Sequence, residues 1–93
     1  MLQFVDMEHE TAMELLSLYR SDFPCLHDGS QGRAATMLAG VLSALPLTKR
    51  KLEDHTILVA GEGSMVSTTA EMFATAIAIQ TGKTVVEERK KVW

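Results

Sequence analysis

Short apolar runs and longer segments of helical periodicity alternate along this chain of 93 residues. The short runs are typical of strands and cover residues 2–5, 24–26, 56–60 and 92–93. Apolar residues three or four positions apart predict helices over residues 12–19, from residue 31 to about Pro46, and from about residue 66 to Gly82. A further short helix is expected over residues 85–91. This order predicts an α/β fold with an incomplete parallel sheet and flanking helices.

Local signals indicate where these helices begin and end. Pro46 is expected to end the second helix or to lie just beyond it, because proline lacks the amide donor that a helix interior uses. Residues 48–55 are polar and are expected to form a connection. Two Thr-x-x-Glu sequences offer capping boxes near helix starts, namely Thr11 with Glu14 and Thr68 with Glu71.

The run 56–60 ends in Gly61-Glu62-Gly63, and Ser64 and a helical segment follow. A strand, a glycine turn and a helix N-terminus form the unit that holds a dinucleotide pyrophosphate in parallel α/β proteins. The full pattern has a third small residue where this chain has Val66. The sequence therefore predicts a partial Rossmann-like strand-turn-helix unit, and a purely structural turn remains the alternative.

Charge and composition exclude several classes of partner. The formal net charge of −3 gives no general attraction to nucleic acid or to anionic membranes. The basic clusters at residues 49–51 and 89–91 are expected to be solvated surface. The apolar runs are far below the length of a membrane span, and no secretory signal is visible. Cys25 is the single cysteine, so no internal disulfide can form.

Other candidate chemistry is weak. The histidines His9, His27 and His55 lack the spacing of metal ligands and are expected to take surface or turn roles. The segment 80–84 resembles the end of a phosphate-binding P-loop but lacks its earlier glycine and does not follow a strand. Glu87 and Glu88 lie near the separation expected of a ribose ligand, yet are interpreted as exposed charges in a polar helix.

Several segments, in order along the chain, resemble malic enzymes, especially the plant NADP-dependent type. Leu2-Gln-Phe-Val-Asp6 is similar to Ile-Gln-Phe-Glu-Asp of that family, and Leu52-Glu-Asp-His-Thr56 to Leu-Ala-Asp-His-Thr. The other matching segments are Ala12 to Arg20, Gln31 to Leu45, Gly61-Glu-Gly63 and Glu87-Glu-Arg-Lys-Lys-Val-Trp93. Because the matches are collinear and cover nearly the whole chain, the resemblance is specific.

The resemblance implies oxidative decarboxylation of L-malate to pyruvate and CO2 with NAD or NADP, assisted by Mg²⁺ or Mn²⁺. The family's metal ligands are a Glu-Asp pair and an aspartate of Asn-Asp-Asp. Here the pair is Val5 and Asp6, and Asn-Asp-Asp becomes His27, Asp28 and Gly29. Asp6 is then the one remaining metal ligand, and Asp28 a remnant of the catalytic loop. The implied cofactor-binding residues are Gly61, Glu62, Gly63 and Ser64.

From this resemblance we expect residues 1–30 to derive from the family's substrate and metal domain, and residues 31–93 from the start of its NAD(P)-binding domain. The family's tyrosine acid and lysine base have no counterpart, so the chain alone is expected to be inactive. We expect NAD or NADP binding to be weak or lost, and Mg²⁺ and Mn²⁺ not to bind. We expect the protein to lie in the cytoplasm, or in the plastid if a transit peptide was lost.

Two other readings remain open. The chain can be a non-enzymatic module that pairs with full-length malic enzyme subunits or with another copy of itself. It can also be a non-functional gene fragment, because a small incomplete sheet leaves apolar faces uncovered.

Overall fold

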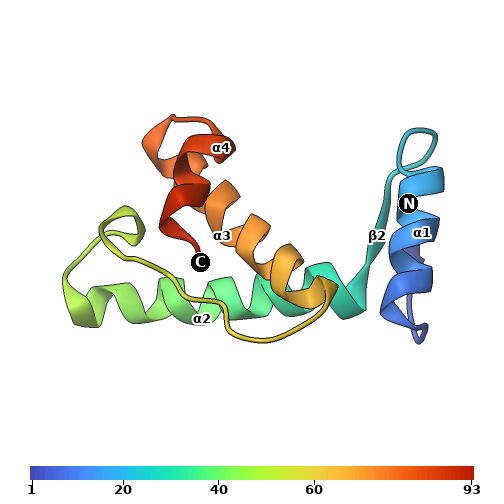
Figure 1. Ribbon diagram of the computed structural model, residues 1–93, viewed down its shortest axis with the longest axis horizontal. Coiled ribbons are helices and arrows are strands. Elements are labelled where there is room, and N and C mark those ends of the chain that lie inside the picture. The colour runs from blue at the N-terminus through green and yellow to red at the C-terminus, as the bar shows by residue number, and fades with distance from the viewer.

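A computed structural model describes residues 1–93 and shows two small α/β units joined by one long helix (Figure 1). The N-terminal unit contains strand β1 (Leu2–Phe4), helix α1 (His9–Tyr19) and strand β2 (Cys25–His27). The two strands are parallel, and Leu2 lies opposite Cys25. A helix that connects two parallel neighbours is the usual crossover, since a tight turn cannot join parallel strands.

Helix α2 (Arg33–Thr48) follows a π-helical turn, η1 (Asp28–Gly32), and runs from the N-terminal unit along the C-terminal unit. It ends at Lys49, whose backbone is left-handed with φ of 56°. The 3₁₀ turn η2 (Leu52–Asp54) then leads the chain back toward the start of the C-terminal unit.

The C-terminal unit repeats the parallel arrangement in a smaller form. Ile57 pairs in parallel with Val92 in a single bridge, and helix α3 (Ser64–Thr81), helix α4 (Val85–Glu88) and the 3₁₀ turn η3 (Arg89–Lys91) lie between them in the chain. The amide of Ile57 donates to the carbonyl of Lys91 at 2.9 Å, and the amide of Trp93 donates to the carbonyl of Ile57 at 2.8 Å.

The main hydrophobic core belongs to the C-terminal unit. Leu52 and Ile77 are fully buried, and Phe73 completes the cluster. Partly buried apolar side chains pack around it, namely Leu38, Leu45, Ile57, Ala76 and Val92. Leu38 and Leu45 come from α2, so the long helix is fixed to this unit by its own apolar stripe. In the N-terminal unit the buried hydrophobic side chains are Ala12 and Leu16, both from α1.

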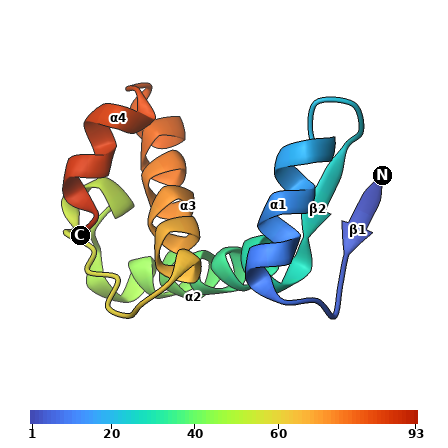
Figure 2. The same cartoon turned by 45° about the vertical axis from the view of Figure 1, so that its right-hand side comes forward.

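The two units stand apart above α2, as Figure 2 shows. The radius of gyration is 14.3 Å. A compact domain of this length has a radius of gyration of about 12 Å. The chain is therefore extended. Its two units contact each other mainly through α2 and through the first turns of the elements beside α2.

The structure confirms the predicted fold class: helices flank an incomplete parallel sheet, and a glycine turn leads into a long helix. It also confirms the short helix after Gly82 and the beginning of a strand at residues 92–93. The predicted strand 56–60 is reduced to the bridge at Ile57, because it has only residues 92–93 as a neighbour.

Both predicted capping boxes are wrong. Helix α1 begins at His9, before Thr11, and its N-cap residue makes no side-chain hydrogen bond. Helix α3 begins at Ser64, and the hydroxyl of Thr68 donates to the Ser64 carbonyl within the first turns. A capping box does form at α4, where Thr84 and Glu87 bond each other's backbone amides.

Three further expectations need correction. Helix α2 passes through Pro46 and continues to Thr48. The connection 48–55 also contributes to the hydrophobic core, because its residue Leu52 is fully buried. The apolar run 2–5 has the pattern of a short buried strand, yet Leu2 and Val5 keep 44% and 51% of their surface exposed.

Candidate functional site

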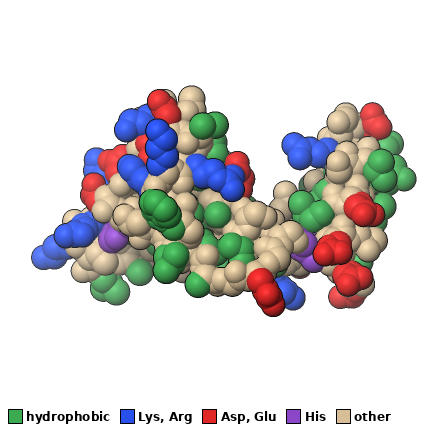
Figure 3. Space-filling model, in the orientation of Figure 1, with side chains coloured by type: hydrophobic (Ala, Val, Ile, Leu, Met, Phe, Trp, Pro, Cys, Tyr) green, Lys and Arg blue, Asp and Glu red, His purple; other side chains and the backbone are tan.

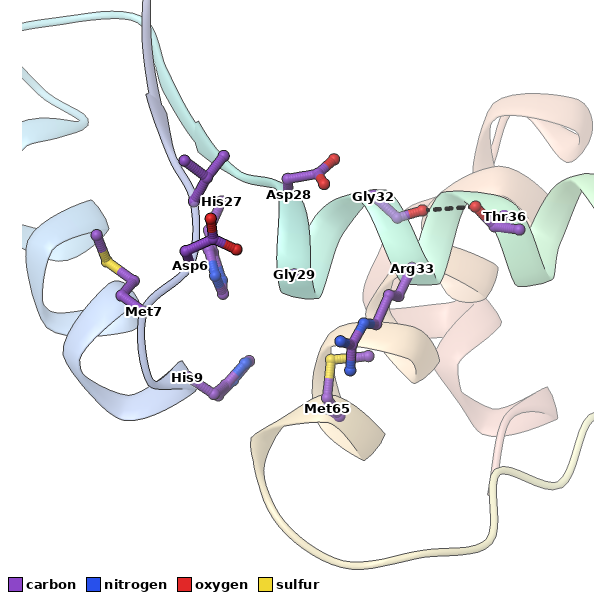
Figure 4. A pocket seen from close by; sticks show the side chains of 11 residues that line it. Asp6, Met7, His9, His27, Asp28, Gly29, Gly32, Arg33, Thr36 and Met65 are labelled. Carbon is purple, nitrogen blue, oxygen red and sulfur yellow. Dashed lines mark hydrogen bonds between the residues drawn. The ribbon is translucent and has the colours of Figure 1, made fainter.

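A cavity of about 760 Å³ lies where the two units meet the start of α2. Figure 4 shows its walls, which come from the β1–α1 connection, the end of β2, the turn η1 and the first turns of α2 and α3. The sequence therefore brings residues from both units to one place. The lining residues are Val5, Asp6, Met7, His9, His27, Asp28, Gly29, Gly32, Arg33, Thr36 and Met65.

His27 is the last residue of β2 and is 3% exposed, so the surface or turn role predicted for it is wrong. Its backbone amide donates to Oε1 of Gln31 at 2.9 Å. Its ring Nδ1 lies 2.9 Å from the hydroxyl of Ser30, which is itself fully buried. These two contacts fix the ring and leave Nε2 without a hydrogen bond.

His9 is the first residue of α1 and faces His27. The two ring centroids lie 5.9 Å apart, and the ring planes are inclined at 58°. Both ring nitrogens of His9 are buried and have no hydrogen-bond partner. Buried polar atoms in proteins are nearly always paired, so this ring calls for a physical explanation.

Gly29 is the residue that makes room for the His27 ring. A Cβ atom at position 29 would lie 2.8 Å from Nε2 and 2.9 Å from Cε1 of His27. Contacts below 3 Å require one group to move. His27 and Gly29 are therefore sterically coupled: the ring occupies the space that a side chain at position 29 would need.

The predicted remnants Asp6 and Asp28 both line this cavity and are both exposed. Asp6 holds a positive φ of 52° just after β1. Asp28 begins η1, and its side chain leans over Gly32, where an added Cβ would be 2.6 Å from its Oδ1. Hence one residue that follows β1 and one that follows β2 line the same cavity.

The donors present do not fit Mg²⁺ or Mn²⁺. Hard cations take six or more oxygen ligands, mainly carboxylates, carbonyls and water. The implied ligand positions hold Val5 and Gly29, which have no side-chain oxygen, and the remaining donors include imidazoles. No group of three or more His, Cys, Asp or Glu side chains gathers closely enough to hold a metal ion.

The glycine turn fits a phosphate group better. Gly63 has φ of 81° and ψ of −178°, a conformation that is almost confined to glycine. A Cβ there would meet nothing within 4 Å, so the space above the turn is open. Helix α3 begins at once with Ser64 and runs for 18 residues, and the first amides of such a helix attract anions. Glu62, exposed in the same turn, opposes that attraction.

The turn and the cavity are neighbours. Met65, in the first turn of α3, lines the cavity, and Figure 4 places the side chain of Arg33 beside it. The sequence pattern alone does not place Arg33, Met65 or His9 here. No local motif marks these three residues, because α2 and the loop before α3 bring them together from distant parts of the chain.

The pair Glu87 and Glu88 lies outside this site. Glu87 is exposed, and hydrogen bonds from the backbone and side chain of Thr84 lower its pKa below the ordinary value of 4.5. Glu88 was expected to be exposed, but it is 1% exposed. Its carboxylate lies 3.0 Å from Nζ of Lys91 and 3.5 Å from Nζ of Lys83, and it accepts a hydrogen bond from the Thr81 hydroxyl at 3.3 Å.

The hydrogen bond from Lys91 lowers the pKa of Glu88 below 4.5 more than burial raises it, and the charges of Lys91 and Lys83 add to the lowering. Lys91 also donates to the carbonyl of Glu53 at 3.1 Å. Glu88 therefore ties the last turn of α3, the end of the chain and η2 together. This role is structural, and the carboxylate points to its own partners instead of the glycine turn.

Comparison with known proteins identifies relatives over the whole chain. Residues 30–93 match the family described as malic enzyme, NAD binding domain. The chain is 40% identical over its full length to NADP-dependent malic enzyme 3 of Arabidopsis thaliana, of which it covers 16%. It is 39% identical to the chloroplastic NADP-dependent malic enzyme of Flaveria pringlei, covering 14%, and 39% identical to the NADP-dependent malic enzyme of Phaseolus vulgaris, covering 16%.

The chain thus spans about one sixth of the length of these relatives. Some of the related enzymes are chloroplastic by name. None of the helices combines the length and apolar character that crossing a bilayer requires.

Proposed function

The chain belongs to the malic enzyme family, and from that premise we propose that it is a malic enzyme-like NAD(P)-binding module without malate-oxidising activity of its own. In this proposal residues 1–30 correspond to part of the family's substrate and metal domain. Residues 31–93 correspond to the N-terminal part of its NAD(P)-binding domain.

The open glycine turn at the start of α3 carries the binding proposal. The pyrophosphate of NAD or NADP would lie over Gly61 and Gly63, against the free amides at Ser64 and Met65. The dinucleotide supplies hydride chemistry when bound. Glu62 places a carboxylate beside the phosphates, so we expect weak affinity, in the high micromolar to millimolar range.

Titration calorimetry of NADP⁺ into the purified chain tests this binding. Replacing Glu62 with alanine removes one repulsion of about 1 kcal/mol, so affinity for NADP⁺ should rise roughly fivefold. Glu10→Ala is the matched control, because Glu10 is an exposed carboxylate in the first turn of another helix, α1, and does not line the cavity. An unchanged affinity in Glu62→Ala would place the dinucleotide elsewhere.

The composition of the cavity supports the absence of catalysis. Oxidation of malate in the family uses a divalent cation to stabilise negative charge on oxygen. Of the implied ligand positions only Asp6 keeps a carboxylate, and Asp28 alone remains of the neighbouring Asp-Asp pair. We expect no malate-dependent formation of NADPH in the presence of Mg²⁺ or Mn²⁺, with a full-length malic enzyme as the positive control. Measurable turnover by the purified chain would refute this part of the proposal.

A second candidate function rests on the amount of surface that the fold leaves uncovered. The accessible surface is 6512 Å². A compact protein of this mass exposes about 5,300 Å², so roughly 1,200 Å² is in excess. A standard protein interface buries about 800 Å² on each partner. This chain therefore has enough extra surface for one interface.

Charge favours another malic enzyme-type chain, or a second copy, as the partner on that surface. Residues 1–30 contain six Asp and Glu but one Arg, whereas residues 31–93 contain eight Lys and Arg and six Asp and Glu. Figure 3 shows acidic side chains gathered over α1, and at the other end of the molecule, around α4, basic side chains mixed with acidic ones. Co-purification with a full-length malic enzyme subunit tests this function, and its failure together with a monomeric mass would oppose it.

A further inference from the structure

The facing pair His9 and His27 is the feature of this molecule that the malic enzyme reading does not use. Both line the cavity, one from the start of α1 and one from the end of β2. We propose that these two imidazoles form a site for a borderline divalent metal ion such as Zn²⁺, in place of the hard cation that the cavity does not fit. The proposal does not depend on NAD(P) binding.

Geometry is the first support. Two imidazoles on one ion, with metal–nitrogen bonds of about 2.0–2.1 Å, have ring centres roughly 5–6 Å apart. The observed separation is 5.9 Å, and the rings are inclined at 58° instead of stacked. The two ring centres therefore already stand at the spacing that a shared ion requires.

The state of the ring nitrogens is the second, independent support. The His27 side chain is buried, and its Nδ1 lies 2.9 Å from the Ser30 hydroxyl, so Nε2 is the ring nitrogen left for a ligand. A second group that holds one ring nitrogen is the usual way in which proteins orient a metal-binding histidine. Both nitrogens of His9 are buried without a partner. A ligand between the rings would satisfy atoms that are otherwise left unpaired.

The chemical class follows from the donors. Imidazole nitrogen suits Zn²⁺, Ni²⁺ and Cu²⁺, whereas Mg²⁺ and Ca²⁺ require oxygen ligands. The protein supplies two ligands, so the other positions of the ion are filled by water. Asp6 and Asp28 line the same cavity and lower the electrostatic cost of a cation, and Arg33 on the opposite wall raises it. Such a site is open and exchangeable.

Zn²⁺ titration of the full 93-residue chain, followed through the histidine ring signals in NMR spectra and by calorimetry, tests the proposal. We expect the signals of His9 and His27 to shift together with one-to-one stoichiometry, and Mg²⁺ in large excess to cause no shift. His55 is the internal control, because it lies in the connection after η2 and does not line the cavity.

Variants separate binding from folding. His9→Asn should weaken Zn²⁺ binding at least tenfold, and Ser30→Ala about 10- to 100-fold as the loss of a positioning residue. His55→Asn should leave binding unchanged. If His27→Asn fails to fold, His9→Asn still decides, because His9 makes no hydrogen bond that its loss would break. Equal binding by His9→Asn, a shift of His55 alone, or no Zn²⁺ binding would each overturn the proposal.

Discussion

Single side chains determine what the cavity can hold, and His27 with Gly29 is the decisive pair. Their coupling means that the family's aspartate cannot simply be restored at position 29 while the His27 ring is present. Gly29 leaves room for the His27 ring, whereas any side chain at position 29 would crowd that ring. The room for a side chain at position 29 therefore depends on the residue at position 27.

Gly29→Ala tests this coupling. The added Cβ would lie 2.8 Å from His27 Nε2, so the unfolding free energy should fall by about 1–3 kcal/mol, as in other overpacked sites. In a His27→Asn background the same change should cost much less, with a coupling energy above about 0.5 kcal/mol. Urea denaturation measures all four proteins. Equal costs in both backgrounds would show that the two positions are independent.

Glu88 gives a prediction on pH. Its pKa is lowered in the folded protein, so its ion pairs stabilise the fold fully above the unfolded value, and that stability is lost as pH falls below about 4.5. Urea midpoints measured from neutral to acidic pH should show this decline. Glu88→Gln should be less stable than the parent at neutral pH and should show a shallower acid decline.

Glu14→Gln is the matched control for Glu88→Gln, because Glu14 is exposed on α1 and takes part in no ion pair. It should keep the parent's midpoint and its acid decline. If Glu88→Gln behaves in the same way as Glu14→Gln, the ion pairs of Glu88 do not stabilise the C-terminal unit.

Whole elements explain which parts of the fold were predictable. Helix α3 carries apolar residues at regular helical spacing. Gly61 and Gly63 precede it and Gly82 follows it, so the local sequence specifies the extent of this helix. Helix α2 has the same regularity, yet its end was misplaced at Pro46. Packing of Leu38 and Leu45 against the core holds this helix, and a tertiary contact of that kind is not visible in local propensity.

The candidate site was only partly predictable for the same reason. Asp6, Asp28 and the glycine turn stand in recognisable segments, and the resemblance placed them. The burial of His27 and its approach to His9 depend on how α1 packs over β2. The burial of Glu88 depends on Lys91, Lys83 and Thr81 closing around it, which a run of charged residues in the sequence does not reveal.

The turn before α3 gives a prediction at the level of that element. Gly63→Ala forces a side chain into a backbone conformation nearly restricted to glycine, so unfolding free energy should fall by about 1–3 kcal/mol. Gly40→Ala, in open space on α2, should instead stabilise the chain by about 0.5–1 kcal/mol. Chemical denaturation compares the two, and a neutral Gly63→Ala would show that the turn is not held in this conformation.

At the scale of the whole molecule, the shape is extended. The N-terminal unit is acidic, and the rest of the chain carries more basic than acidic side chains. Such a chain should associate through its uncovered surface instead of remaining a monomer at high concentration. Light scattering after size exclusion should give a mass above the 10.2 kDa of one chain at low ionic strength, and a lower mass as salt screens the charges. A monomeric mass at all salt and protein concentrations would argue against the pairing function.

The central claim is that the start of α3 still receives a dinucleotide, and a thermal melt followed by circular dichroism tests it most directly. The purified chain is heated with and without NADP⁺, with Gly63→Ala in parallel. At a tenfold excess over its Kd, NADP⁺ should stabilise the fold by about 1.4 kcal/mol and raise the midpoint by roughly 5–10 °C. A cooperative melt that NADP⁺ leaves unmoved up to about 10 mM, a tenfold excess over a millimolar Kd, would contradict the account.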